Sequence, residues 1–130
     1  MTTPFWCLLV AVLLPYLLAG AAGYFKQKQF GAIDNHLPRV QGAQLTGAGA
    51  RAWAAQANAW EALAVFASAV FVAHLAGADP ARSATAAQLF VAARLAHAVC
   101  YLADWATARS LVFFVGMGSC LWLFVLAARA

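Results

Sequence analysis

Four apolar segments dominate this sequence, and each has the length of a membrane-spanning helix. They run from about 5 to 25, 53 to 76, 83 to 105 and 110 to 128. About 20 predominantly apolar residues are enough to cross the hydrocarbon core of a bilayer as an α-helix. The last three segments are joined by short connections, which place consecutive helices antiparallel. The sequence therefore predicts an all-α integral membrane four-helix bundle that forms one domain over residues 1–130.

The composition supports a membrane location and argues against a soluble domain. Only 9% of the residues are charged and 65% are hydrophobic, whereas a soluble domain carries about 25% charged residues. The net charge of +4 comes from basic residues scattered singly, without the basic face and interleaved aromatic residues of nucleic-acid binding. The 3 cysteines lie in separate segments and have no metal-ligand spacing. We expect no nucleic-acid partner, no disulfide framework and no metal site.

The distribution of lysine and arginine predicts the orientation of the helices. The connection 26–50 is the longest, contains Lys26, Lys28 and Arg39, and is followed directly by Arg51. Because positive residues are enriched in cytoplasmic loops, we expect this connection in the cytoplasm and both termini outside it. The first apolar segment lacks the basic start of a signal peptide, which favours a retained helix over a cleaved leader.

Two of the apolar segments carry polar and charged residues at helical spacing. Residues three, four and seven apart share one face of a helix. On the second and third segments such residues form two stripes: Arg51, Asn58 and Glu61, then Arg94, His97, Tyr101 and Asp104. Charged residues inside a bilayer are costly and mark functional sites by default. We interpret the stripes as one candidate site between adjacent antiparallel helices.

Glu61 and Arg94 are expected at similar depth in this arrangement. At a rise of about 1.5 Å per residue, Glu61 lies roughly 12 Å and Arg94 roughly 16 Å from the cytoplasmic ends of their predicted helices. Opposite charges at similar depth predict an ion pair. A structural interpretation remains open, because buried ion pairs can set helix register without adding stability. Asn58 can likewise serve only as an interhelical hydrogen-bonding residue.

Further basic residues surround the same pocket. Arg109 and Ser110 open the fourth segment, and Lys26 and Lys28 follow the first. A cationic pocket rich in hydrogen-bond donors suits a small polyanionic ligand that enters from water. The apolar helix walls beside it suit a lipophilic small molecule that enters from the bilayer.

These motifs together resemble the MAPEG family, the membrane-associated proteins of eicosanoid and glutathione metabolism. The resemblance covers nearly the whole chain and rests on Asn58-x-x-Glu61, Arg94-x-x-His97-x-x-x-Tyr101, Arg109-Ser110 and the run Asp34-Asn-His-Leu-Pro-Arg39. That run is similar to the first loop of bacterial members. The resemblance implies a homotrimer, in the inner membrane of a bacterium, with glutathione bound between subunits near the cytoplasmic face.

The resemblance also implies roles for individual residues. Arg109 would be catalytic, close to the sulfur of glutathione, with Ser110 beside it. A thiol of pKa about 8.5 becomes a better nucleophile near neutral pH when a cation stabilises its thiolate, and arginine never loses its charge. The implied glutathione-binding residues are Arg51, Asn58, Glu61, Arg94, His97, Tyr101 and Lys26.

One position departs from the pattern of the family. Well-studied members carry an arginine four residues before the asparagine, and this chain has Ala54 there, with Arg51 one turn earlier. We expect a glutathione transferase or peroxidase that acts on a lipophilic electrophile. The alternative, which Ala54 favours, is a non-catalytic trimeric membrane protein of the same fold that binds a lipid or another anion. A small multidrug exporter is disfavoured, because such a transporter would need an acidic residue in its first helix and the segment 5–25 contains none.

Overall fold

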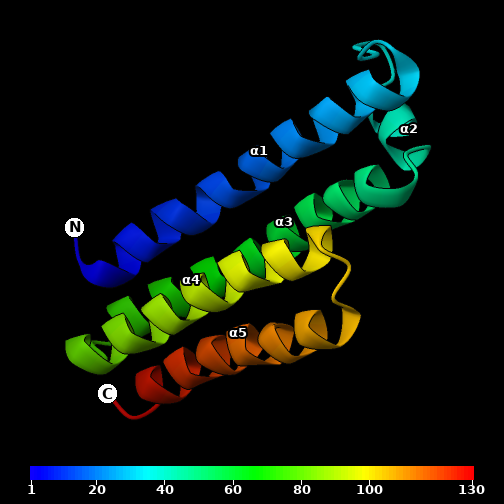
Figure 1. Ribbon diagram of the computed structural model, residues 1–130. Coiled ribbons are helices and arrows are strands. Elements are labelled where there is room, and N and C mark those ends of the chain that lie inside the picture. The colour runs from blue at the N-terminus through cyan, green and yellow to red at the C-terminus, as the bar shows by residue number, and fades with distance from the viewer.

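The computed structural model describes all 130 residues and contains five helices and no strand (Figure 1). The helices are α1 (Thr3–Phe30), α2 (Pro38–Ala43), α3 (Gly47–Leu75), α4 (Pro80–Leu102) and α5 (Ala106–Ala127). All except α2 are long and apolar enough to cross a membrane. The prediction of an all-α membrane bundle of four spanning helices is therefore confirmed.

The helices extend beyond the apolar segments that predicted them. α1 continues past residue 25 to Phe30, and α3 begins at Gly47 instead of 53. The connection between them is therefore shorter than 26–50, and α2 occupies part of it. The apolar pattern marks only the part of a helix inside the hydrocarbon, which is about 30 Å thick. With 28 residues, α1 is about 42 Å long and projects beyond that layer.

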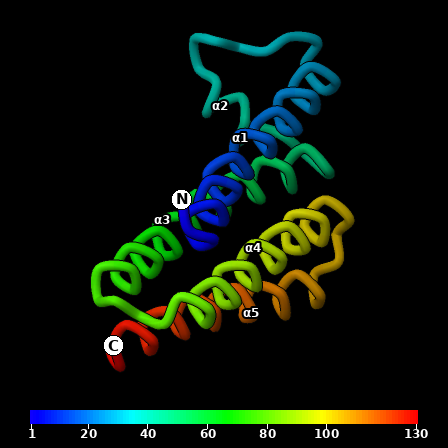
Figure 2. Tube along the Cα trace, turned by 90° about the vertical axis from the view of Figure 1, so that its left-hand side faces the viewer, coloured from blue at the N-terminus to red at the C-terminus, as the bar shows by residue number.

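The helices form two pairs that pack together into one bundle. α1 packs mainly against α3, and α4 packs mainly against α5, while α1 and α5 lie diagonally opposite without contact. Figures 1 and 2 show the α1–α3 connection and the α4–α5 turn at one end of the bundle, here called the loop end. Both termini and the α3–α4 turn lie at the opposite end, here called the terminal end. Each helix pair is therefore antiparallel.

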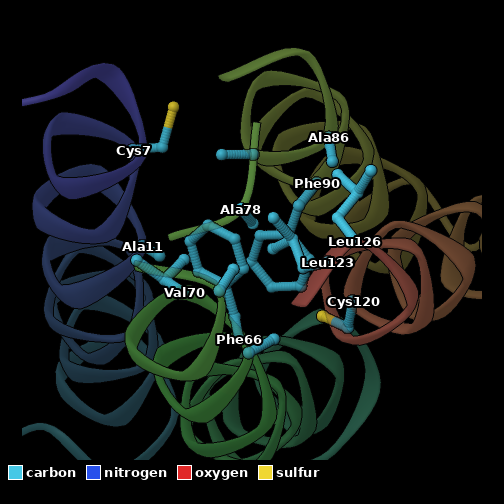
Figure 3. Packing of buried hydrophobic residues seen from close by; sticks show 13 residues of the cluster. Cys7, Ala11, Phe66, Val70, Ala78, Ala86, Phe90, Cys120, Leu123 and Leu126 are labelled. Atoms are coloured by element: carbon cyan, nitrogen blue, oxygen red, sulfur yellow. The ribbon is translucent and has the colours of Figure 1, made fainter. Parts of the chain in front are cut away.

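Two aromatic rings form the centre of the core nearer the terminal end. Phe66 and Phe90 stack with their ring centroids 3.9 Å apart and their planes at 9°. Val70 and Leu123, each at most 1% exposed, pack beside them (Figure 3). Nearer the loop end the core contains small residues that let the backbones approach closely: Ala55, Ala59 and Ala98.

The α3–α4 turn follows directly from its sequence. Gly77 adopts a left-handed backbone conformation at φ 76°, which glycine accepts without steric cost. Asp79 then caps α4, because its carboxylate accepts a hydrogen bond from the backbone N–H of Arg82 at 2.7 Å. Pro80 occupies the first helical position, where its missing N–H leaves no bond unmade. These residues fix the direction in which α4 enters the bundle.

Lys26 fastens the α1–α3 connection to the bundle. Its ammonium group donates to the carbonyl oxygen of Pro38 at 2.6 Å and lies 4.9 Å from the centre of the Trp53 ring. Gly42 covers the same ring so closely that a Cβ atom there would lie 2.7 Å from it. The side chain of Lys26 is therefore buried, at 6% exposure, and holds the connection against α3.

Candidate functional site

Arg94 on α4 is the centre of the polar cluster. It is 4% exposed, and its Nη2 donates to Oδ1 of Asn58 on α3 at 2.8 Å. The amide nitrogen of Asn58 in turn donates to Oε2 of Glu61 at 3.5 Å. Asn58 therefore links the buried guanidinium to a carboxylate that is exposed at the surface of the bundle.

The predicted ion pair between Glu61 and Arg94 is wrong, because the only ion pair in the structure is the one between Arg51 and Asp104. The error came from the helix boundaries. Because α3 begins at Gly47 and α4 ends at Leu102, Glu61 lies about 21 Å and Arg94 about 12 Å from those helix ends. Asn58, at about 16 Å, is closer in depth to Arg94 and takes the contact.

Arg94 keeps a buried donor without a partner. It lines a cavity of about 170 Å³ together with Asn58, Glu61 and Cys120. Its Nε atom is buried and makes no hydrogen bond. A buried charged group with an unused donor is costly, so the chemistry of this cavity fits a ligand that brings an acceptor.

A second cavity of about 220 Å³ adjoins the first, since Asn58 and Phe113 line both. The polar residues around it are Asn58, His97, Tyr101, Arg109 and Ser110. The guanidinium carbon of Arg109 lies 4.4 Å from the centre of the Tyr101 ring, a cation–π contact that limits its movement. His97 is only 3% exposed. Its ring packs edge-on against the ring of Tyr101, with the two ring centroids 5.4 Å apart.

The beginning of α5 adds positive potential to the second cavity. Arg109 lies in the first turn of α5, where the helix dipole also attracts anions. Ser110 follows it, and its hydroxyl donates to the carbonyl oxygen of Ala106 at 3.2 Å. The cavity therefore contains the guanidinium of Arg109, which packs on Tyr101, and the hydroxyl of Ser110, which is hydrogen-bonded to the backbone of α5.

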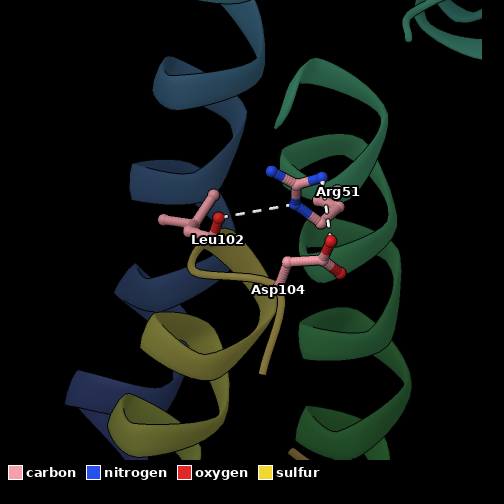
Figure 4. Close-up of polar contacts among 3 residues, drawn as sticks. All are labelled: Arg51, Leu102 and Asp104. Atoms are coloured by element: carbon pink, nitrogen blue, oxygen red, sulfur yellow. Dashed lines mark hydrogen bonds and ion pairs between the residues drawn. The ribbon is translucent and has the colours of Figure 1, made fainter. Parts of the chain in front are cut away.

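Arg51 does not reach either cavity. Its Nη1 lies 3.6 Å from Oδ2 of Asp104, and its Nε donates to the carbonyl oxygen of Leu102 at 3.4 Å (Figure 4). Asp104 was expected on the polar face of the third spanning helix, but α4 ends at Leu102. Asp104 lies in the turn beyond it at φ 62°. Arg51 therefore ties α3 to the α4–α5 turn instead of filling the place left by Ala54.

The basic residues of the first connection also lie away from the cavities. Lys26 is held between Pro38 and Trp53. Lys28 lines a separate hollow between the end of α1, which contributes Gln29, and the start of α3, which contributes Ala48 and Gly49. The residues of the predicted site thus fall into three groups. Arg51 binds the α4–α5 turn, and Lys26 holds the α1–α3 connection. The two adjoining cavities are lined by the others: Asn58, Glu61, Arg94, His97, Tyr101, Arg109 and Ser110.

One wall of the site was missed by the sequence patterns, because α5 contributes residues that carry little charge. Phe113 lines both cavities, and Gly116, Met117 and Cys120 line the first. Cys120 is 1% exposed and lines this cavity together with Arg94. A signal was present, since these residues follow Arg109 at intervals of three and four and therefore share its helix face.

A model of the MAPEG family matches residues 3–129. The chain belongs to the MAPEG family. The resemblance inferred from the polar motifs is thus confirmed over nearly the whole length, and the protein is an integral multi-pass membrane protein of a family associated with glutathione and eicosanoid metabolism. No curated protein and no solved structure shows a significant match to it. In this MAPEG protein the motif residues of three helices line two adjoining cavities.

Proposed function

We propose that this MAPEG protein is a glutathione-dependent transferase or peroxidase that acts on a lipophilic electrophile. The observation that carries the proposal is the pair of arginines in adjoining cavities. Arg94 is buried with an unpartnered Nε atom, and Arg109 is fixed on the ring of Tyr101. Two cations held in a partly apolar cavity favour an anionic ligand.

The donor set fits the chemical groups of glutathione, an anionic tripeptide thiol. Arg94 offers its free Nε to a carboxylate or a peptide carbonyl, and guanidinium groups bind carboxylates well. Glu61 is the one carboxylate of the two cavities and suits the ligand's amino group. Asn58 has both a donor and an acceptor for the peptide backbone.

Arg109 is the residue we assign to activation of the thiol. Bound glutathione would supply a thiol whose thiolate is the nucleophile. The guanidinium of Arg109 remains charged at any physiological pH, so it stabilises that thiolate without exchanging a proton. The hydroxyl of Ser110 donates to Ala106 and must rotate away from this carbonyl before it can donate to the sulfur.

We further propose a homotrimer in the inner membrane, with the loop end toward the cytoplasm. Glu61 and Ser110 are exposed on the single subunit, and Phe114, which also lines the second cavity, is 69% exposed. These exposed rims leave surfaces that a neighbouring subunit would cover. The basic residues near the loop end agree with a cytoplasmic location.

A non-catalytic trimeric protein that binds a lipid or another anion is the second candidate. Ala54 removes an expected cation, and Arg51 does not replace it, because it is engaged by Asp104 and Leu102. Such a protein would have the same cavities but would not turn over a thiol.

The test is equilibrium binding of glutathione to the full chain in lipid nanodiscs, followed by turnover of an aryl halide electrophile. Saturable binding at millimolar glutathione, weakened in both Asn58→Ala and Arg109→Ala, would support the proposal. Arg82→Ala is the matched control, since Arg82 is an exposed arginine at the terminal end and should leave binding unchanged. Binding without turnover would count against a transferase, and absence of binding would refute the glutathione site and favour the second candidate.

A further inference from the structure

A further cavity, larger than both cavities of the candidate site, lies at the terminal end, away from Arg94 and Arg109. It measures about 560 Å³, compared with about 170 and 220 Å³ for the cavities at the candidate site. His74 at its rim lies sixteen residues beyond Asn58 on α3, which is about 24 Å along the helix. Ligand sites in proteins typically measure about 300–1,000 Å³, so this cavity has the size of a binding site of its own.

The inner wall of this cavity is apolar. Phe5 from α1, Val70 and Ala73 from α3 and Leu123 from α5 all line it. Protein interiors are closely packed, with few voids larger than a water molecule. The remaining lining includes the polar residues Thr2, Thr3, His74 and Ser83. An apolar body is therefore the occupant that matches this wall.

One buried hydroxyl in the lining has no hydrogen-bond partner. Ser83 is 6% exposed, and its Oγ atom is unpaired. The other serines in the spanning helices all donate to the carbonyl oxygen four residues earlier, at 2.9 Å for Ser68, 3.2 Å for Ser110 and 2.9 Å for Ser119. The hydroxyl of Ser83 makes no such bond, although the backbone N–H of Ser83 donates to the carbonyl oxygen of Asp79 at 3.0 Å. Its buried hydroxyl therefore keeps an unused donor beside the cavity.

The lining also defines the charge of the ligand. No lysine, arginine, aspartate or glutamate lines the cavity, and its ionisable groups are the exposed His74 and the amino terminus at Met1, a residue that is 76% exposed. Burying an unpaired charge against the apolar inner wall would be costly. His74 at the rim is packed edge-on against Phe5, with ring centroids 4.9 Å apart. The buried inner wall therefore carries no charge and suits an uncharged molecule.

We propose that this cavity is a second ligand site that binds an uncharged lipophile through one oxygen acceptor, with the hydroxyl of Ser83 as the donor. A carbonyl group is the simplest acceptor of this kind. The ligand's apolar body would lie against Val70, Ala73 and Leu123, and its oxygen would face the first turn of α4. This site does not depend on the proposed glutathione chemistry at the loop end.

Photolabelling with benzophenone tests the proposal, because benzophenone is uncharged, apolar and carries a single carbonyl. The full chain is labelled in lipid nanodiscs, and the labelled residues are found by peptide mass spectrometry. We expect saturable labelling in 1–5, 70–78 and 80–84 and at Leu123, the parts of the chain that contribute the cavity lining. Ala84→Phe, which fills the cavity from its lining, should abolish this labelling. Labelling that does not saturate, or that falls only on the lipid-facing surface, would overturn the proposal.

A matched pair of competing ligands tests the role of the hydroxyl. 2-Adamantanone and adamantane have nearly the same shape, but only the ketone has an acceptor. We expect the ketone to compete roughly three- to tenfold better, the range that one net hydrogen bond supplies. This preference should vanish in Ser83→Ala and persist in the control Ser68→Ala, with thermal unfolding used to verify that each variant is folded. Equal competition by both compounds in the wild-type protein would also overturn the proposal, whatever the variants do.

Discussion

The contact between Asn58 and Arg94 offers the sharpest test of the polar cluster. Asn58→Ala removes the only hydrogen-bond partner of a guanidinium that is 4% exposed. Arg94→Met removes the charge itself and keeps an unbranched side chain in the same space. A cycle of the wild type, both single variants and the double variant measures the free energy of coupling between the two residues.

The expected magnitude follows from burial and charge. Hydrogen bonds between membrane helices couple by about 0.6 kcal/mol on average and by about 1.7 at most. Hydrogen bonds to charged groups contribute about 1.5–3 kcal/mol. Because Arg94 is charged, buried and bonded to no other residue, we expect a coupling of about 1.5 kcal/mol. Asn58→Ala alone should lower the free energy of unfolding by about 2–3 kcal/mol, since it leaves an unpaired buried charge. In the Arg94→Met background the same substitution should lower it by distinctly less.

The assay is reversible unfolding in mixed micelles with increasing denaturing detergent, followed by tryptophan fluorescence. Gln56→Ala is the matched control, because Gln56 lies on the same helix, is partly buried and makes no side-chain hydrogen bond. Gln56→Ala should change the free energy of unfolding by the same amount in the wild-type and Arg94→Met backgrounds. If Asn58→Ala cost the same in both backgrounds, to within about 0.5 kcal/mol, the reasoning from burial and charge would be refuted.

Other substitutions test the packing around the site in the same unfolding assay. Gly42→Ala should destabilise the protein by about 1–3 kcal/mol, because its Cβ atom would lie 2.7 Å from the rigid ring of Trp53; an unchanged midpoint would contradict this contact. Asp104→Gly should change stability by less than about 1 kcal/mol, since relief of the left-handed backbone at φ 62° offsets loss of the exposed ion pair with Arg51. A loss above about 2 kcal/mol would show that this pair is stronger than surface pairs usually are. Phe66→Ala should cost about 3–5 kcal/mol, because that ring is 0% exposed, and a cost below about 1 kcal/mol would argue against the stacked core.

Much of the architecture could be predicted from local patterns. Apolar length indicated four spanning helices, and all four are present. Helical spacing placed Asn58, Arg94, His97 and Tyr101 on facing stripes, and they line adjoining cavities. Both inferences succeed because the rise and periodicity of a helix depend only on its own backbone.

The pairing of charges needed the tertiary structure. Helix ends are set by caps and turns outside the apolar stretch, so Gly47 and Leu102 could not be placed as boundaries from hydrophobicity. A shift of a few residues moved Glu61 away from the depth of Arg94 and brought Asn58 there instead.

Other features depended on which helix lies beside which. Arg51 pairs with Asp104, fifty-three positions away, only because α3 passes the α4–α5 turn. The unpaired hydroxyl of Ser83 carries no charge and belongs to no motif, so nothing in its sequence neighbourhood marks it. The wall formed by Cys120 had only its helical spacing from Arg109 as a signal. Their surroundings exist only after three or more helices have packed, and packing is a property of the whole bundle, whereas apolar length and periodicity belong to each segment separately.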